Sequence, residues 1–152
     1  MNKIIQSLCD YSGSFSGRGT NHDNEEFLGQ LKIEPILSSK GVEIVFKATG
    51  NDGTVYHEEK TIVAPTENEN VGLWTLNNNV PYLYQHDFQE VNAVSGANKT
   101  LCFLHNAPED NDSFREEIAI DLWKDGDVSY RYSWGLPGGE YRERSGLRMK
   151  KQ

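Results

Sequence analysis

The sequence has few of the residues that mark a metal, redox or disulfide-stabilised protein. It contains only two cysteines among 152 residues, and neither belongs to a Cys-x-x-Cys pair, the spacing that structural zinc sites and dithiol redox centres use. Cys9 and Cys102 lie far apart, and Cys102 sits within an apolar run, so we expect two reduced thiols in the core rather than a disulfide. The spacings His-x-His and His-Glu-x-x-His are also missing, and we therefore expect no metal site.

Long apolar runs and an excess of positive charge are missing as well. No apolar segment approaches the roughly 20 residues that cross a bilayer, and the apolar part of the N-terminal stretch is too short for a secretory signal. The formal net charge is −8, from 15 Lys and Arg against 23 Asp and Glu, and a field of that sign repels phosphate backbones. We expect a cytoplasmic protein that binds neither nucleic acid nor membranes.

What the chain does contain is a series of short loops rich in glycine, asparagine and aspartate. These residues tolerate the positive φ angles that tight hairpin turns require. The loops separate β-rich runs of about a dozen residues, and they lie at residues 38–41, 51–53, 96–98, 124–126 and 136–139. Hairpins repeated at this spacing predict an antiparallel up-and-down meander, which closes into a barrel or folds into a sandwich.

The runs between the loops alternate apolar and polar residues with the period of two that is typical of strands. This pattern predicts strands over residues 11–21, 25–37, 42–49, 54–64, 71–77, 82–88, 90–95, 100–105, 114–122, 128–134 and 141–149. A short helix over residues 2–10 precedes them, because Asn2 can cap it and Ile4, Ile5 and Leu8 fall on one face.

The strand faces separate charge from aromatic rings. On the last three predicted strands, arginines and carboxylates share one face, and cross-strand pairs of opposite charge stabilise a wet face by roughly 0.2–1 kcal/mol each. We take that face as the outside, which places an aromatic lining inside: Trp74, Tyr82, Tyr84, Phe103, Tyr130, Tyr132 and Trp134. Aromatic rings suit a binding pocket, and ten strands leave room for one where eight are about full.

Polar side chains on the predicted inner faces are candidates for ligand contact. His57 and Glu59 share a face of one strand, and a histidine beside a carboxylate is either a hydrogen-bonded pair on the wall or a group for proton transfer. His86 and His105 lie on aromatic faces of different strands, as ligand contacts or as histidines satisfied within the core. The predicted ligand-binding residues are His57, Glu59, Trp74, Tyr84, His86, Phe103, His105 and Tyr132.

Two further carboxylates fall on otherwise apolar faces. Glu116 and Glu143 each lie near the end of a predicted strand. A carboxylate inside a dry barrel costs several kcal/mol unless it is paired or protonated. Together inside, the two would bind a ligand amine or act as general acid and base; alternatively, both lie at the barrel mouth in water.

The start of the chain carries a short motif. After the predicted helix come Gly13-Ser14-Phe15 and then Gly17-x-Gly19. The first string is similar to the Gly-x-Trp opening of the calycin superfamily, with Phe in the Trp place, and the glycine spacing resembles the start of its nitrobindin-like members. The resemblance covers residues 1–152 as a single domain, and it implies an all-β meander of about ten antiparallel strands closed into a calycin-like barrel, with one short N-terminal helix. Calycins, which include lipocalins and fatty-acid-binding proteins, hold small hydrophobic ligands or cofactors inside the barrel.

Two family features fit this chain incompletely. Nitrobindin-like proteins bind haem through a histidine late in the chain, whereas no histidine follows His105 here. We therefore expect no cofactor and keep haem as a secondary alternative. The fatty-acid-binding group places an arginine inside, near the last strand. Arg142, Arg144 and Arg148 lie in that region. The charge pattern of the strand faces predicts that they point outward, whereas the resemblance implies an inward arginine.

These features favour binding of a small, partly hydrophobic or aromatic molecule in a barrel cavity, without catalysis. One alternative is an enzyme of the same fold, in which His57 and Glu59 move a proton on the bound molecule. The other is a structural or partner-binding barrel with a filled interior, including a homodimer formed through an exposed apolar strip. A cavity would separate the first two from the third.

Overall fold

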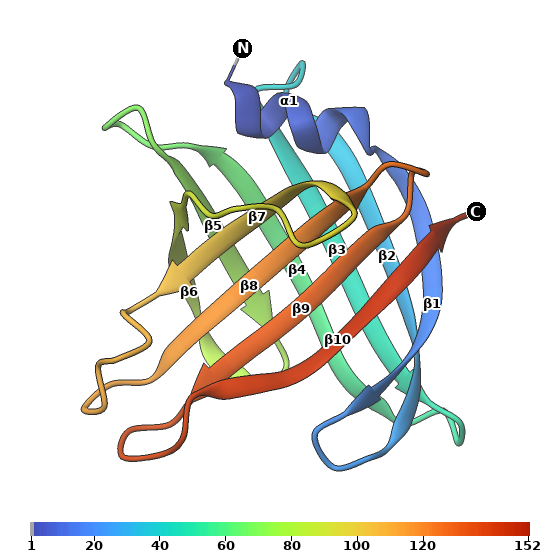
Figure 1. Cartoon of the computed structure of the whole chain (residues 1–152), viewed down its shortest axis with the longest axis vertical. Coiled ribbons are helices and arrows are strands. Elements are labelled where there is room, and N and C mark those ends of the chain that lie inside the picture. The colour runs from blue at the N-terminus through green and yellow to red at the C-terminus, as the bar shows by residue number, and fades with distance from the viewer. Residues whose placement is uncertain (1) are drawn as a thin grey trace.

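Ten antiparallel strands close into one barrel in a computed structural model that describes residues 2–152 (Figure 1). The elements are α1 (Lys3–Asp10), β1 (Gly13–Asn21), β2 (Glu26–Ile36), β3 (Gly41–Gly50), β4 (Val55–Pro65), β5 (Val71–Asn77), β6 (Val80–Gln89), β7 (Ala97–His105), β8 (Arg115–Trp123), β9 (Val128–Gly135) and β10 (Arg142–Lys151). Each strand pairs with its neighbour in the chain, and β1 pairs with β10 to close the ring. The predicted all-β up-and-down barrel with one short N-terminal helix is confirmed.

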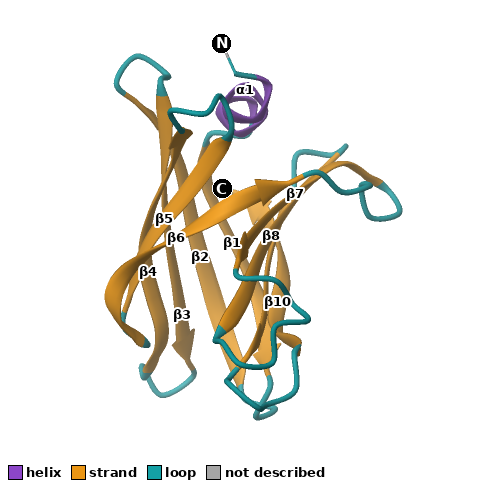
Figure 2. Cartoon of the chain, turned by 90° about the vertical axis from the view of Figure 1, so that its left-hand side faces the viewer, coloured by secondary structure: helices purple, strands orange, loops and turns teal. Residues whose placement is uncertain are grey.

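The helix α1 lies across one end of the barrel (Figures 1 and 2). The Asn2 side chain caps it by accepting hydrogen bonds from the amides of Ile4 (2.8 Å) and Ile5 (3.3 Å). Ile5 and Leu8 are buried and join the core cluster beneath the helix. None of the helices in residues 2–152 is long and apolar enough to span a membrane.

The inner wall changes character along the barrel axis. Aliphatic side chains such as Ile44, Ile120 and Val128 are fully buried near α1, and they fill that end of the barrel. Toward the other end, the same inner faces of β3, β8 and β9 carry aromatic, small and charged side chains. Both cysteines are free thiols, as expected, with Cys102 buried and Cys9 partly buried.

The predicted strand over residues 90–95 is wrong. This segment is the connection between β6 and β7 and has no strand partner among residues 2–152. Its backbone hydrogen bonds are local instead: the Val94 amide donates to the Thr100 hydroxyl (3.0 Å), and the Val94 carbonyl accepts from the Ala97 amide (3.0 Å). A short run of alternating apolar and polar residues does not form a strand when no adjacent strand is available to pair with it.

Of the two alternatives for Glu143, the inward one is wrong. The register of β9 and β10 shifts between Glu143 and Ser145, so Arg144 is an extra residue that interrupts the alternation. Glu143 therefore lies outside, where its Oε1 is 3.6 Å from Nη1 of Arg131. Beyond the bulge, Ser145 faces the interior.

Arg115 lies on the outer face of β8, as the charge pattern suggests, but it is buried by loops and only 1% exposed. Its guanidinium donates to the carbonyls of Pro108 (3.1 Å), Leu136 (2.7 Å) and Gly139 (2.7 Å), and to the side-chain oxygen of Asn111 (3.2 Å). These bonds tie the β7–β8 loop to the β9–β10 turn at the end of the barrel away from α1.

Candidate functional site

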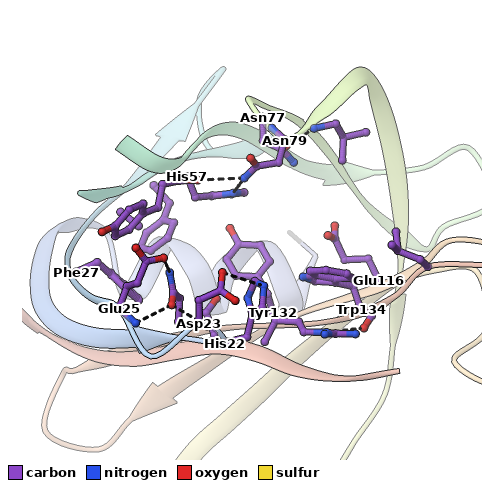
Figure 3. A pocket seen from close by; sticks show the side chains of 18 of the residues that line it. His22, Asp23, Glu25, Phe27, His57, Asn77, Asn79, Glu116, Tyr132 and Trp134 are labelled. Carbon is purple, nitrogen blue, oxygen red and sulfur yellow. Dashed lines mark hydrogen bonds and ion pairs between the residues drawn. The ribbon is translucent and has the colours of Figure 1, made fainter. Parts of the chain in front are cut away.

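A cavity of about 480 Å³ opens at the end of the barrel opposite α1. This volume lies within the range of small-molecule sites. The walls come from all sides of the ring, with contributions from the β1–β2 and β5–β6 turns (Figure 3). The lining residues are Asn21, His22, Asp23, Glu25, Phe27, Phe46, Ala48, Tyr56, His57, Asn77, Asn79, Val80, Phe114, Glu116, Tyr132, Trp134, Leu136, Arg144 and Ser145.

Aromatic rings form much of this wall. Phe46 from β3 and Tyr132 from β9 lie with their ring centroids 6.2 Å apart, and His57 from β4 lies 5.0 Å from Tyr132. The small side chain of Ala48 follows Phe46 on the same face of β3, which leaves space in front of these rings. At the rim, the guanidinium carbon of Arg144 lies 4.1 Å from the centre of the Trp134 ring, an arrangement that stabilises both side chains.

His57 lines the cavity, but both of its ring nitrogens face protein groups. Nδ1 of His57 lies 2.9 Å from the side-chain amide nitrogen of Asn79, and this Asn79 nitrogen also lies 3.3 Å from the carbonyl oxygen of Tyr56. A carbonyl oxygen can only accept a hydrogen bond, so the amide nitrogen of Asn79 is the donor in both contacts. Nδ1 of His57 is therefore an acceptor, and the neutral ring carries its proton on Nε2. Nε2 lies 3.7 Å from Oε1 of Glu59, too far for a hydrogen bond. His57 therefore offers the cavity its ring and no free basic nitrogen.

Glu59 is a fully buried carboxylate behind His57. Its Oε2 accepts hydrogen bonds from the hydroxyls of Thr75 (2.8 Å) and Thr61 (3.1 Å), whereas Oε1 has no hydrogen-bond partner in residues 2–152. Burial acts to raise the pKa of Glu59, but the attraction of His57 and the hydrogen bonds from the two threonine hydroxyls outweigh it and hold the pKa below its ordinary value. The carboxylate is thus the stable form at neutral pH.

This depressed pKa predicts how stability depends on pH. A carboxyl group whose pKa is lower in the folded state stabilises the fold above its unfolded pKa, about 4.5 here, and loses that contribution as the pH falls through the folded value. We expect the free energy of unfolding, measured by urea titration from pH 7 to pH 3, to fall more steeply for the wild type than for Glu59→Gln.

An exposed carboxylate supplies the control for this titration. Glu34 pairs only with Lys32 at the surface, so Glu34→Gln should follow the wild-type curve closely. Parallel curves for the wild type and Glu59→Gln below pH 4.5 would show that Glu59 does not stabilise the fold as a carboxylate.

Glu116 is the carboxylate that reaches the cavity. Its Oε1 accepts hydrogen bonds from the Tyr84 hydroxyl (2.6 Å) and from Nε2 of His86 (2.9 Å), and the Asn77 amide donates to the Tyr84 hydroxyl (3.2 Å). Burial, together with the charge of Glu116, raises the pKa of Tyr84 far above its ordinary value, so the phenol remains a donor. Oε2 accepts no hydrogen bond from residues 2–152, and Figure 3 shows the carboxylate directed into the cavity.

The structure places the other predicted ligand-binding residues at different depths. Tyr132 lines the cavity with His57. Tyr84 and His86 lie behind Glu116, and the His105 ring packs 5.1 Å from Tyr84 while its Nδ1 contacts the Gln85 carbonyl at 2.8 Å. Phe103 is fully buried in the core and is not part of the lining.

The expectation that Trp74 and Tyr82 line the interior is wrong. Trp74 projects from the outer face of β5, because its neighbours Leu73 and Thr75 are the fully buried residues of that strand. Both faces of β5 carry large apolar side chains, so alternation alone could not distinguish inside from outside. Tyr82 lies at the end of β6 and is 56% exposed.

The three arginines near the last strand have separate roles. Arg144 lies at the cavity rim, where it donates to the carbonyls of Trp134 (3.2 Å) and Glu140 (2.7 Å). Arg142 is exposed. Arg148 lies outside, with its guanidinium carbon 4.0 Å from the centre of the Trp123 ring. Only the bulge brings an arginine to the cavity, and the sequence pattern carries no sign of it.

Several lining residues were not predicted as site residues. Phe27, Phe46 and Ala48 are on apolar faces that the strand pattern identified, so they could have been included. Asn77 ends β5 and Asn79 belongs to the β5–β6 turn, where the sequence indicates only a change of direction. Their hydrogen bonds to Tyr84 and His57 depend on how the barrel closes.

Two histidines of residues 2–152 line the cavity. The ring nitrogens of His57 face Asn79 and Glu59, and Nε2 of His22 lies 3.6 Å from a carboxylate oxygen of Asp23. Within residues 2–152, no group of three or more His, Cys, Asp or Glu side chains could hold a metal ion.

No family model matches the sequence, and no curated protein matches it. Among solved structures, the chain is similar to Rv2717c from M. tuberculosis, with a TM-score of 0.69 and 13% identity over 99% of this chain and 98% of that chain. At such low identity the likeness shows the fold alone, a small barrel. A de novo designed fluorescence-activating β-barrel has a TM-score of 0.49 and 16% identity over 96% of this chain and 98% of that chain, a score too low to support an argument.

Proposed function

We propose that this barrel binds one small, partly hydrophobic molecule in its cavity and does not transform it. The observation that carries the proposal is a cavity of about 480 Å³ that combines aromatic walls with a few fixed polar groups, the composition typical of small-molecule sites. The hydroxyl of Tyr132 is buried without a hydrogen-bond partner in residues 2–152, and a bound molecule would supply one.

We also place the chain with calycin-like barrels as part of this proposal. The helix followed by an antiparallel ten-strand meander agrees with that placement, and so does the interior position of the cavity. The cavity argues against a barrel with a filled interior. The enzyme alternative has less support, because Nδ1 of His57 is held by Asn79 and Nε2 is buried beside Glu59.

Titration with N-phenyl-1-naphthylamine, a neutral dye whose fluorescence rises in apolar surroundings, tests this function. We expect saturable binding of one dye per chain. Trp134→Ala should weaken it about tenfold, because the lost ring contributes stacking and buried area worth about 1.4 kcal/mol. Trp74→Ala removes the same kind of ring from the outer wall and should leave affinity within about twofold.

Two outcomes would contradict the proposal. One is a dye site that weakens with Trp74→Ala and not with Trp134→Ala. The other is the absence of saturable dye binding, together with native mass spectra of the purified protein that show no retained small molecule.

A further inference from the structure

We propose that the molecule bound in this cavity carries a cationic nitrogen, such as a protonated amine or amidine, that docks on the free oxygen of Glu116. The inference rests on the proposed function and adds the chemical class of the ligand. It follows from three features of the wall: a prearranged carboxylate, the lack of a free lysine or arginine among the described lining residues, and a second unpaired oxygen close to an aromatic surface.

Glu116 is held as an acceptor before any ligand arrives. It is only 7% exposed, and both of its protein donors, Tyr84 and His86, bind the same oxygen, Oε1. The other oxygen faces the cavity without a hydrogen bond from residues 2–152. A carboxylate this little exposed is stabilised by each further donor or cation that meets it. A ligand N⁺–H group would provide the missing partner in a charge-assisted hydrogen bond.

No lysine or arginine among the described lining residues is free to neutralise Glu116. Arg144 is the only lysine or arginine among the lining residues, and its guanidinium is committed to two backbone carbonyls and to the face of Trp134. The carboxylates at the mouth, Asp23 and Glu25, have the same sign as Glu116. His22 lies beside this pair, with its Nε2 3.6 Å from Asp23. The excess of carboxylates over lysine and arginine in the lining favours ligands of positive charge.

The Tyr132 hydroxyl is the third feature, and it is independent of the first two. Tyr132 is 7% exposed and lines the cavity, and its hydroxyl is buried without a partner in residues 2–152. It can accept a hydrogen bond from a nitrogen group, and the nearby ring of Trp134 suits a flat or cationic group. Glu116, Tyr132 and Trp134 face the same space in Figure 3.

Three ligands that share an indole ring test the charge: tryptamine (cation), tryptophol (neutral) and indole-3-acetate (anion). By isothermal titration calorimetry at pH 7, we expect tryptamine to bind at least tenfold more tightly than tryptophol, and indole-3-acetate to bind most weakly. Glu116→Gln should weaken tryptamine at least tenfold and change tryptophol less than threefold.

Glu117→Gln is the matched control for this substitution. Glu117 is the next residue of β8, on the outer face, where it accepts a hydrogen bond from Tyr141 (3.2 Å), so its change should leave the affinity order intact. If Glu116→Gln fails to fold, the order of the three ligands on the wild type decides the question.

The outcomes separate this inference from the proposed function. Tryptophol or indole-3-acetate binding as tightly as tryptamine would overturn the cation preference and leave the binding function standing. Failure of all three indoles, with N-phenyl-1-naphthylamine still bound, would also overturn it. Failure of the dye as well would overturn the proposed function and, with it, the inference.

Discussion

Replacing Ala48 by tryptophan should abolish binding, lowering the affinity for N-phenyl-1-naphthylamine at least about 100-fold, or about 2.7 kcal/mol. Ala48 is 4% exposed, lies on the inner face of β3 beside Phe46, and lines the cavity. It is directly opposite His57 in the β3–β4 register. An indole ring at this position would occupy the space that a ligand needs. Since the space is open in the wild type, the variant should fold, with a Tm equal to or above that of the wild type.

Lys47→Trp is the control for the size of the added ring. Lys47 is the preceding residue of β3 and points to the outer face, so the same ring added there should leave dye affinity within about twofold. Undiminished binding by a folded Ala48→Trp variant, as judged by circular dichroism, would place the site outside the barrel.

Replacing Arg115 by alanine should destabilise the protein by about 3 kcal/mol or more. The guanidinium is 1% exposed and donates to backbone carbonyls of two separate loops. Its loss would leave carbonyls such as those of Leu136 and Gly139 without their charged donor. For a protein of this size, the loss corresponds to a fall in Tm of roughly 6–12 °C in thermal unfolding.

Arg115→Lys and Arg142→Ala complete this series. Lysine keeps the charge but cannot reproduce the planar set of donors, so Arg115→Lys should fall between the wild type and Arg115→Ala. Arg142 is exposed, and its Nε lies 3.8 Å from a Glu140 oxygen, so its removal should cost less than about 0.5 kcal/mol. A loss below about 1 kcal/mol for Arg115→Ala would show that the two loops hold together without it.

Local sequence patterns were sufficient to predict the antiparallel meander, and the family resemblance distinguished a closed barrel from a sandwich. Turn residues divide the chain into hairpins, and on β3 and β9 the alternation separates inside from outside, as with Phe46 and Tyr132. The predictions that were wrong concern places where the local pattern is ambiguous. β5 has apolar residues on both faces, which concealed the outward position of Trp74, and the bulge at Arg144 shifts the alternation by one residue.

The arrangement of the candidate site depends on contacts between residues far apart in the chain. The pairing of Glu116 with Tyr84 and His86 joins β8 to β6 across the interior, and no spacing in the sequence indicates it. The same is true of His57, whose orientation depends on Asn79 in the β5–β6 turn. Candidate residues could therefore be found from strand faces, whereas their partners and protonation required the closed barrel.

The three tryptophans of the chain report on three different places. Trp134 lines the cavity, Trp74 is on the outer face of β5, and the indole nitrogen of Trp123 donates to the Ser129 hydroxyl (2.7 Å) beneath Arg148. Each indole N–H gives its own signal in a ¹H–¹⁵N NMR spectrum of labelled protein. A ligand in the cavity should therefore affect one signal and spare two.

The most direct test of the binding cavity is this spectrum recorded as unlabelled tryptamine is added to saturation. We predict that the Trp134 indole signal shifts progressively while the Trp74 and Trp123 signals stay in place. A Trp134 signal that remains fixed while Trp74 or Trp123 moves would contradict a ligand site inside the barrel.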